Sequence, residues 1–337
     1  MMTLDETRQA TGANLRYDEA LVSPCQECNA VCCYYLPLQV LPARTLMEID
    51  YIRYLLHFPR VVAGYSMGGQ WSMYWAVPCR HLDPEARLCK VHGTLEQPRT
   101  CTAYNEHDCW YRRALNGESK GFLRFDRHLM ERLLPMIAFD GDRNVAAVPT
   151  WAQMIDLCSG YPLGSELDRR GWVHPMAKGN GSGSHSSEVP GNGHKPASKT
   201  ISELMQDPCA GCKAPCCRYL YLPLPVPTSF MQVDYVRFSL NFPGTECVVS
   251  PLSWWLLLRA DCECLDAESR QCTLHGKPER PLRCAHLNQW DCGQYKRLLH
   301  PDSGFHRMDW RGFAELAEQI RFDDNGQIVQ LPSPVSG

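Results

Sequence analysis

Cysteine is the residue type whose spacing points most clearly to chemistry. The chain of 337 residues contains 19 cysteines, and a Cys-x2-Cys-x3-Cys-Cys motif occurs at residues 25–33 and again at residues 209–217. Each motif is followed by four more cysteines with the same spacing in both places. The first set is Cys25, Cys28, Cys32, Cys33, Cys79, Cys89, Cys101 and Cys109, and the second set is Cys209, Cys212, Cys216, Cys217, Cys262, Cys272, Cys284 and Cys292. Core packing does not explain such regular spacing, so we predict that both sets are metal ligands.

The first four cysteines of each set suggest how a metal would be held. The two-residue gap in Cys-x2-Cys lets two thiolates converge on one ion from a tight turn, as in zinc sites and iron–sulfur clusters. We expect Cys32 and Cys33 to point in different directions, so that the pair serves two sites or divides into a ligand and a redox thiol. Eight cysteines can complete two four-sulfur sites, or one site and a reactive set. Disulfides and metal-free redox thiols are the alternatives to metal ligation.

The sequence leaves the choice between two metals open. All-thiolate ligation suits both tetrahedral Zn²⁺ and iron–sulfur clusters, and we favour iron–sulfur. His92 and His275 each follow a cysteine of the set as Cys-x2-His, which is a zinc-ligand spacing. A histidine that hydrogen-bonds to the backbone is the interpretation we prefer for both.

Composition and charge indicate which cellular compartment and which classes of partner to expect. The chain starts with MMTLDETRQATG, which lacks the basic and apolar regions of a secretory signal, so we expect a cytoplasmic protein with reduced thiols. No apolar run approaches the ~20 residues that span a bilayer. The net charge of −3 argues against a nucleic-acid partner. A protein or peptide is the partner we expect, and the oligomeric state is left open.

The repeated spacing predicts two homologous α+β domains. Residues 1–172 form the first cysteine-cluster domain with a C-terminal extension, residues 173–200 a flexible Gly/Ser-rich linker, and residues 201–337 the second cysteine-cluster domain. Both are expected to be small metal-binding units in which sulfur ligands supplement a thin core. Replacing Cys28 or Cys212 by Ser is therefore expected to melt its own domain with little effect on the other.

Local patterns place several elements around the cysteines in both copies. Capping boxes at Thr45-x-x-Glu48 and Ser229-x-x-Gln232 predict helices that run to about Phe58 and Phe242. Alternating apolar residues predict a strand over residues 71–77, and the corresponding residues 254–260 are expected to form a strand too, so that each copy reaches its second cysteine group along a strand. Turns are expected at residues 83–86 and 266–269, helices at residues 127–137 and 310–320, and an Asn-Gly hairpin near residue 325.

An Asp-x2-Arg pair recurs on the first predicted helix of each copy. Asp50 and Arg53 match Asp234 and Arg237, and a solvated i,i+3 ion pair is the favoured interpretation. The alternative is that the arginines donate to cluster sulfurs or that the aspartates orient a ligand.

These motifs resemble one known family. The Cys-x2-Cys-x3-Cys-Cys motif, the downstream cysteines and Arg280-Pro281-x2-Cys284 resemble the YkgJ-type cysteine-cluster family, here in tandem duplication. The resemblance implies zinc or iron chelation. A related branch, the flagellin lysine N-methylases, has a similar cysteine cluster and implies iron–sulfur-dependent methylation of protein lysines. In the first copy Gln97 stands where the motif has arginine, while Pro98 and Cys101 remain.

We therefore expect a metal-binding cysteine-cluster protein, with iron–sulfur favoured over Zn. It would support electron transfer or the modification, for example methylation, of a protein or peptide. A zinc-stabilised interaction module without catalysis and a metal storage or delivery protein are the alternatives. Whether the chain is an enzyme, and which residues would be catalytic, is left open.

Overall fold

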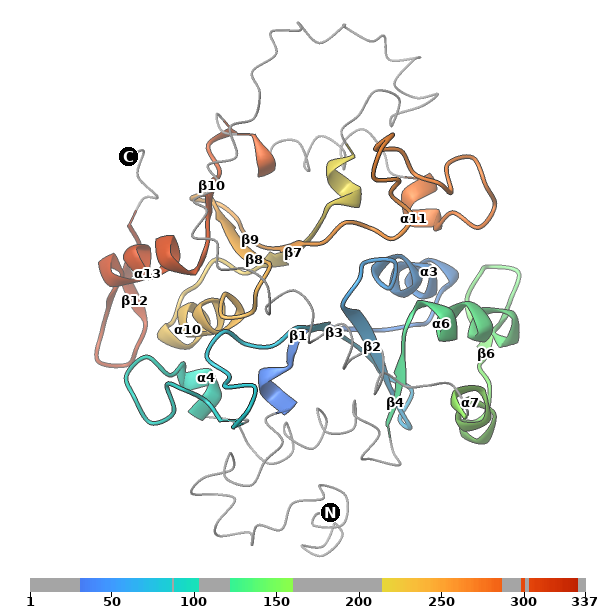
Figure 1. Ribbon diagram of the computed structural model, residues 1–337, viewed down its shortest axis with the longest axis horizontal. Coiled ribbons are helices and arrows are strands. Elements are labelled where there is room, and N and C mark those ends of the chain that lie inside the picture. Colours follow the sequence, from blue (N-terminus) through green and yellow to red (C-terminus); the bar gives the residue numbers. More distant parts are fainter. Residues whose placement is uncertain are drawn as a thin grey trace, which may run out of the picture.

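The computed structural model describes residues 31–86, 88–102, 122–159, 214–286, 298–300 and 303–332. We refer to the described residues up to 159 as the first half and those from 214 as the second half. The predicted linker lies outside the described residues, as do the predicted ligands Cys25, Cys28, Cys109, Cys209, Cys212 and Cys292. The described elements form a mixed α+β structure, as predicted (Figure 1).

Each half contains one four-stranded antiparallel sheet, and the two sheets have the same strand order. The first sheet runs β1 (Tyr35–Leu41), β3 (Trp71–Ala76), β2 (Val61–Ser66), β4 (Phe122–Phe125). The second runs β7 (Tyr219–Leu224), β9 (Trp254–Arg259), β8 (Thr245–Val249), β10 (His306–Met308). The predicted strands before the second cysteine group are therefore confirmed as β3 and β9, and both lie inside their sheets.

A helix follows the first strand of each sheet. In α3 (Leu46–Leu55) the predicted capping box is confirmed, because Thr45 Oγ1 accepts from Glu48 N at 3.2 Å and Glu48 Oε2 accepts from Thr45 N at 3.1 Å. The predicted box of α10 (Phe230–Ser239) is wrong. The amide oxygen of Gln232 accepts from Thr228 N at 2.7 Å instead, and Ser229 makes no side-chain capping bond. Both helices also end earlier than predicted, since turns occupy the residues before Phe58 and Phe242.

The outer elements follow the predictions closely. An aspartate caps each outer helix: Asp126 caps α6 (Arg127–Leu133) and Asp309 caps α13 (Trp310–Gln319). The 3-10 turn η2 (Leu134–Met136) extends α6. Small two-stranded sheets follow, formed by β5 (Ala138–Phe139) with β6 (Val145–Ala147) and by β11 (Arg321–Phe322) with β12 (Ile328–Gln330). In the first half α7 (Trp151–Cys158) then packs on the core with Cys158 buried, as expected for a structural thiol.

The two halves share one hydrophobic core rather than two separate ones. A single cluster of buried side chains contains Phe58 and Trp75 from the first half together with Phe242 and Leu258 from the second. The indole Nε1 of Trp75 donates to the carbonyl oxygen of Pro243 at 3.2 Å. The expectation that one unit melts with little effect on the other does not fit this shared core.

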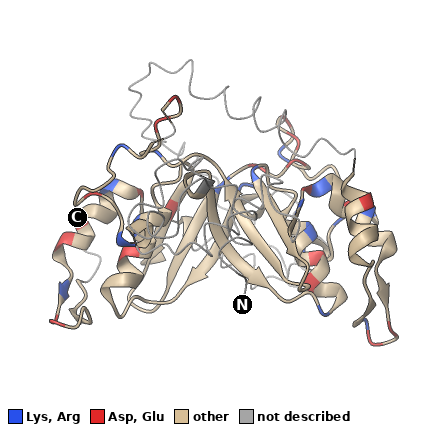
Figure 2. Ribbon diagram, turned by 90° about the horizontal axis from the view of Figure 1, so that it is seen from below, with Lys and Arg blue, Asp and Glu red and all other residues tan. Residues whose placement is uncertain are grey.

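Seen from below, the two sheets lie side by side in the middle and helices flank them at both ends (Figure 2). Charged residues gather on the outer helices and loops, whereas the sheets are almost free of them in this view. No helix within the described ranges is long and apolar enough to cross a lipid bilayer.

The shared core makes a prediction about unfolding. Replacing the fully buried Trp75 by Ala should cost about 3–5 kcal/mol, because a large cavity opens and the hydrogen bond to the other half is lost. Hydrogen exchange read by mass spectrometry during urea unfolding should show both sheets losing protection together. Leu95→Ala, at a side chain that is 99% exposed, is the control. Full protection of β7 and β9 while β1 to β3 unfold would contradict a single core.

Candidate metal centres

Three separate segments bring cysteines together in the first half. Cys32 and Cys33 lie in η1 (Val31–Cys33), directly before β1, and Cys79 follows β3. Because β1 and β3 are hydrogen-bonded neighbours, the two segments meet, and Cys79 N donates to Cys33 O at 2.6 Å. Cys101 comes from the short helix α4 (Arg99–Thr102).

The second half repeats this arrangement. Cys216 and Cys217 lie in η3 (Pro215–Cys217) before β7, and Cys262 follows β9. Cys262 N donates to Cys217 O, again at 2.6 Å. Cys284 comes from the short helix α11 (Leu282–Ala285). The sheet topology therefore places corresponding cysteines in corresponding positions.

A tight turn carries the next cysteine of each set. Asp83 Oδ1 accepts from the backbone N of Glu85 and Ala86 at 2.9 and 3.0 Å, which confirms the predicted turn. An isolated bridge then pairs Leu82 with Cys89. In the second half Asp266 forms the equivalent turn, and Leu265 pairs with Cys272.

The neighbouring cysteines of η1 do not diverge as expected. The Sγ atoms of Cys32 and Cys33 lie 4.0 Å apart. The pKa of the Cys33 thiol is raised by its hydrogen bond with Cys32, by burial and by the charges that Cys32, Cys79 and Cys101 would carry as thiolates. Cys217 behaves in the same way, with Cys216 as its first partner. Both thiols of each neighbouring pair therefore belong to one group.

Burial and mutual repulsion disfavour thiolates in both groups. Burial raises the pKa of Cys79 to about 11 and that of Cys284 to about 12. The pKa of Cys101 is raised by burial and then by Cys32, Cys79 and Cys89. Several negative charges cannot gather at such sites unless a cation compensates them.

We name these groups by their described members. The first cluster is Cys32, Cys33, Cys79, Cys89 and Cys101, and the second cluster is Cys216, Cys217, Cys262, Cys272 and Cys284. Among the described residues alone, no three Cys, His, Asp or Glu side chains are close enough to hold a metal ion. The donor chemistry nevertheless fits Zn²⁺ or an iron–sulfur cluster, since soft thiolate ligands suit both, and the remaining predicted ligands lie outside the described residues.

The Nδ1 atoms of the two histidines of the Cys-x2-His spacing contact side chains. Nδ1 of His275 accepts from Nη1 of Arg280 at 3.0 Å. In the first half Nδ1 of His92 lies 3.5 Å from Nε2 of Gln97. Gln97, which replaces the motif's arginine, thus keeps the contact with the histidine.

The Asp-x2-Arg pairs are not the solvated ion pairs that we favoured. Asp234 on α10 is 1% exposed and bonds to the first half, where its Oδ2 accepts from the N and Oγ1 of Thr100 at 2.7 and 2.9 Å. Thr100 precedes Cys101 in α4. Arg237 binds Asp234 Oδ1 at 2.7 Å and also donates to Gln97 O at 3.3 Å.

The reciprocal contact joins α3 to α11. Asp50, which is 4% exposed, accepts from Arg283 N at 3.0 Å through Oδ2, and Arg283 precedes Cys284. Arg53 lies 3.6 Å from Asp50 and donates to Glu279 O at 2.8 Å. Figure 1 shows this exchange, with α4 of the first half beside α10 and α11 of the second half beside α3. The sequence suggested an orienting role for the aspartates only as an alternative. It did not indicate that the aspartates form hydrogen bonds with the opposite half.

One contact between the halves involves different residue types in its two copies. His81 Nε2 of the first half lies 3.2 Å from Asn241 Oδ1 of the second half. In the repeat, Cys264 corresponds to His81 and His57 corresponds to Asn241. The pKa of Cys264 is lowered by a hydrogen bond with Cys262 and further by His57 and Arg127. Cys264 has no counterpart in the repeated spacing, which is why the sequence did not single it out.

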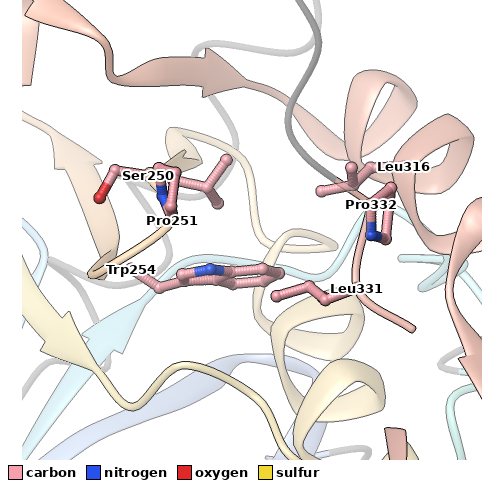
Figure 3. Close-up of a pocket in the computed structure, with 7 residues that line it drawn as sticks. Ser250, Pro251, Trp254, Leu316, Leu331 and Pro332 are labelled. Atoms are coloured by element: carbon pink, nitrogen blue, oxygen red, sulfur yellow. The ribbon is translucent and has the colours of Figure 1, made fainter. Parts of the chain in front are cut away.

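A pocket of about 150 Å³ lies elsewhere in the second half (Figure 3). The indole of Trp254 faces the side chains that close it. It is lined by Val249, Ser250, Pro251, Trp254, Leu316, Leu331 and Pro332. No thiol or charged side chain is among them, so the cysteine clusters remain the candidate site.

Comparisons of this chain with protein-family models, with curated proteins and with solved structures find no match. The function is therefore inferred from the arrangement of the residues.

The raised pKa values predict how the metal-free thiols react. At pH 8 a thiol with a pKa of about 11 holds ~100-fold less thiolate than one at the ordinary value of 9.0, and the thiolate is the nucleophile. Iodoacetamide should therefore modify Cys79 slowly at pH 8, and the rate should keep rising towards pH 11. The chain unfolded in guanidinium is the control. A rate in the folded chain that levels off near pH 9 would contradict the raised pKa.

Proposed function

We propose that this chain is a metal-binding protein whose two cysteine clusters each hold an inorganic centre, with iron–sulfur favoured over zinc. The observation that carries the proposal is the convergence, in each half, of thiols from three separate segments at a partly buried place. Thiolates that are buried together repel one another and are poorly solvated. A bound cation turns that repulsion into attraction, so it allows a fold to keep them together.

The donor set supports a sulfur-ligated centre. In both clusters the adjacent histidine is already contacted at Nδ1 by the residue at position 97 or 280. The cysteines are therefore the donors that remain common to both halves. Thiolate-only ligation is typical of iron–sulfur clusters and of structural zinc.

The resemblance to cysteine-cluster proteins gives the proposal its reaction class. An iron–sulfur centre, when bound, supplies one-electron chemistry, and this chain would use it for electron transfer or for modifying a protein or peptide. Methylation of protein lysines is the specific modification that the related branch suggests. The protein is proposed to act in the cytoplasm, where thiols stay reduced.

A zinc-stabilised interaction module is the second candidate. One observation favours it: both clusters lie where the two halves are joined, and each short cysteine helix packs on the opposite half. A structural zinc site contributes directly to folding at such a junction. Metal storage or delivery is a third candidate, and it requires that a chelator remove the metal without unfolding the chain.

Anaerobic purification followed by iron, zinc and sulfide determination tests the proposal. We expect a brown protein with iron and acid-labile sulfide. A colourless protein with zinc would support the second candidate, and a chain without bound metal would contradict both.

Substitution of single cysteines locates the centres. Cys101→Ser or Cys284→Ser should lower the metal content by about half, because each removes a ligand from one of two centres, and the double variant should hold almost none. Cys158→Ala, at a buried thiol outside both clusters, is the matched control and should keep the full content. Equal metal content in all of these variants would exclude Cys101 and Cys284 as ligands.

A further inference from the structure

We propose that each cysteine cluster is positioned by the opposite half, with Asp234 positioning Cys101 and Asp50 positioning Cys284. In this arrangement neither half assembles its centre alone. The inference rests on the proposed function where it concerns metal, but the positioning itself is a property of the thiols and can be tested without metal.

The carboxylates of Asp234 and Asp50 are both buried. A buried carboxylate is costly unless it is paired and hydrogen-bonded. Asp234 satisfies both oxygens, one with Arg237 and the other with the backbone and hydroxyl of Thr100. Two of its three hydrogen bonds therefore depend on α4 being docked, so the burial of Asp234 and the position of α4 depend on each other.

The two helices that carry Cys101 and Cys284 are short. α4 and α11 are four residues long, and an isolated helix of that length is unstable in water. Each is held by the opposite half. Asp234 on α10 and Asp50 on α3 each accept a hydrogen bond from the backbone N–H of the residue directly before the cysteine. Arg237 and Arg53 on the same two helices donate to the backbone carbonyl oxygens of Gln97 and Glu279. The cysteine can stay in place only while this contact persists.

The contact between an aspartate and a cysteine helix occurs in both directions between the halves. Thr100 and Arg283 occupy matching positions in the repeat, as do Asp234 and Asp50, and the two bonds measure 2.7 and 3.0 Å. Further reciprocal bonds lie nearby, since Arg80 N donates to Asn241 O and Glu263 N donates to His57 O, each at 2.9 Å. Each half therefore supports the cysteine helix of the other through the same kind of contact.

Cysteine-specific alkylation of the metal-free full chain tests the positioning. Asp234→Asn should raise the modification rate of Cys101 by about tenfold, the effect of losing one buried charge-assisted hydrogen bond, and should leave Cys284 unchanged. Asp50→Asn should do the reverse. Asp140→Asn, on the exposed β5–β6 turn, is the control and should change neither. Mass spectrometry reads each cysteine separately.

Metal content then tests the consequence for the centres. In a Cys284→Ser background, where only the first centre remains, Asp234→Asn should lower the residual metal and Asp50→Asn should not. In a Cys101→Ser background the two effects should exchange. If the parent chain binds no metal, the proposed function fails, while the alkylation pattern still decides the positioning. If each aspartate affects only the cysteine of its own half, or neither cysteine, the inference is overturned.

Discussion

Repulsion among buried thiolates is the constraint on which the structure of this protein depends. Each half gathers cysteines from the start of one strand, the end of its neighbour and a short helix, and burial raises the pKa of Cys79 and Cys284 well above the ordinary value. Without a cation, the chain can keep these groups together only by keeping them protonated. A metal centre removes that restriction, because it favours the thiolate form and neutralises its charge. Spacing and burial therefore lead to the same functional class.

The short cysteine helices explain why the two halves are interleaved. Four-residue helices that carry a cluster cysteine need support from outside, and the support comes from α10 for Cys101 and from α3 for Cys284. The buried pairs of Asp234 with Arg237 and Asp50 with Arg53 lie in the sequence-distant half in each case. A shared core containing Trp75 and Phe242 then makes the pair of sheets one folding unit. The two halves thus resemble a dimer whose protomers exchange a segment, within one chain.

Much of the local structure could be predicted from the sequence, and the long-range contacts could not. Alternation of large apolar residues identified β3, the repeated spacing then identified β9, and Thr45 with Glu48 fixed the start of α3. β1 and β7 were missed because Pro37 and Pro223 interrupt the strand pattern. At Ser229 the box was wrong because Thr228 competes for Gln232. The repeated spacing shows which residues correspond, but it carries no information on whether a loop packs on the helix of its own half or on the helix of the other half.

X-ray absorption spectroscopy at the edge of the bound metal, on the anaerobically purified full chain, tests the central claim most directly. The account predicts a first coordination shell of sulfur alone, at about 2.3 Å for zinc or iron. A shell of oxygen and nitrogen, or a chain whose cluster cysteines are joined in disulfides and hold no metal, would contradict it.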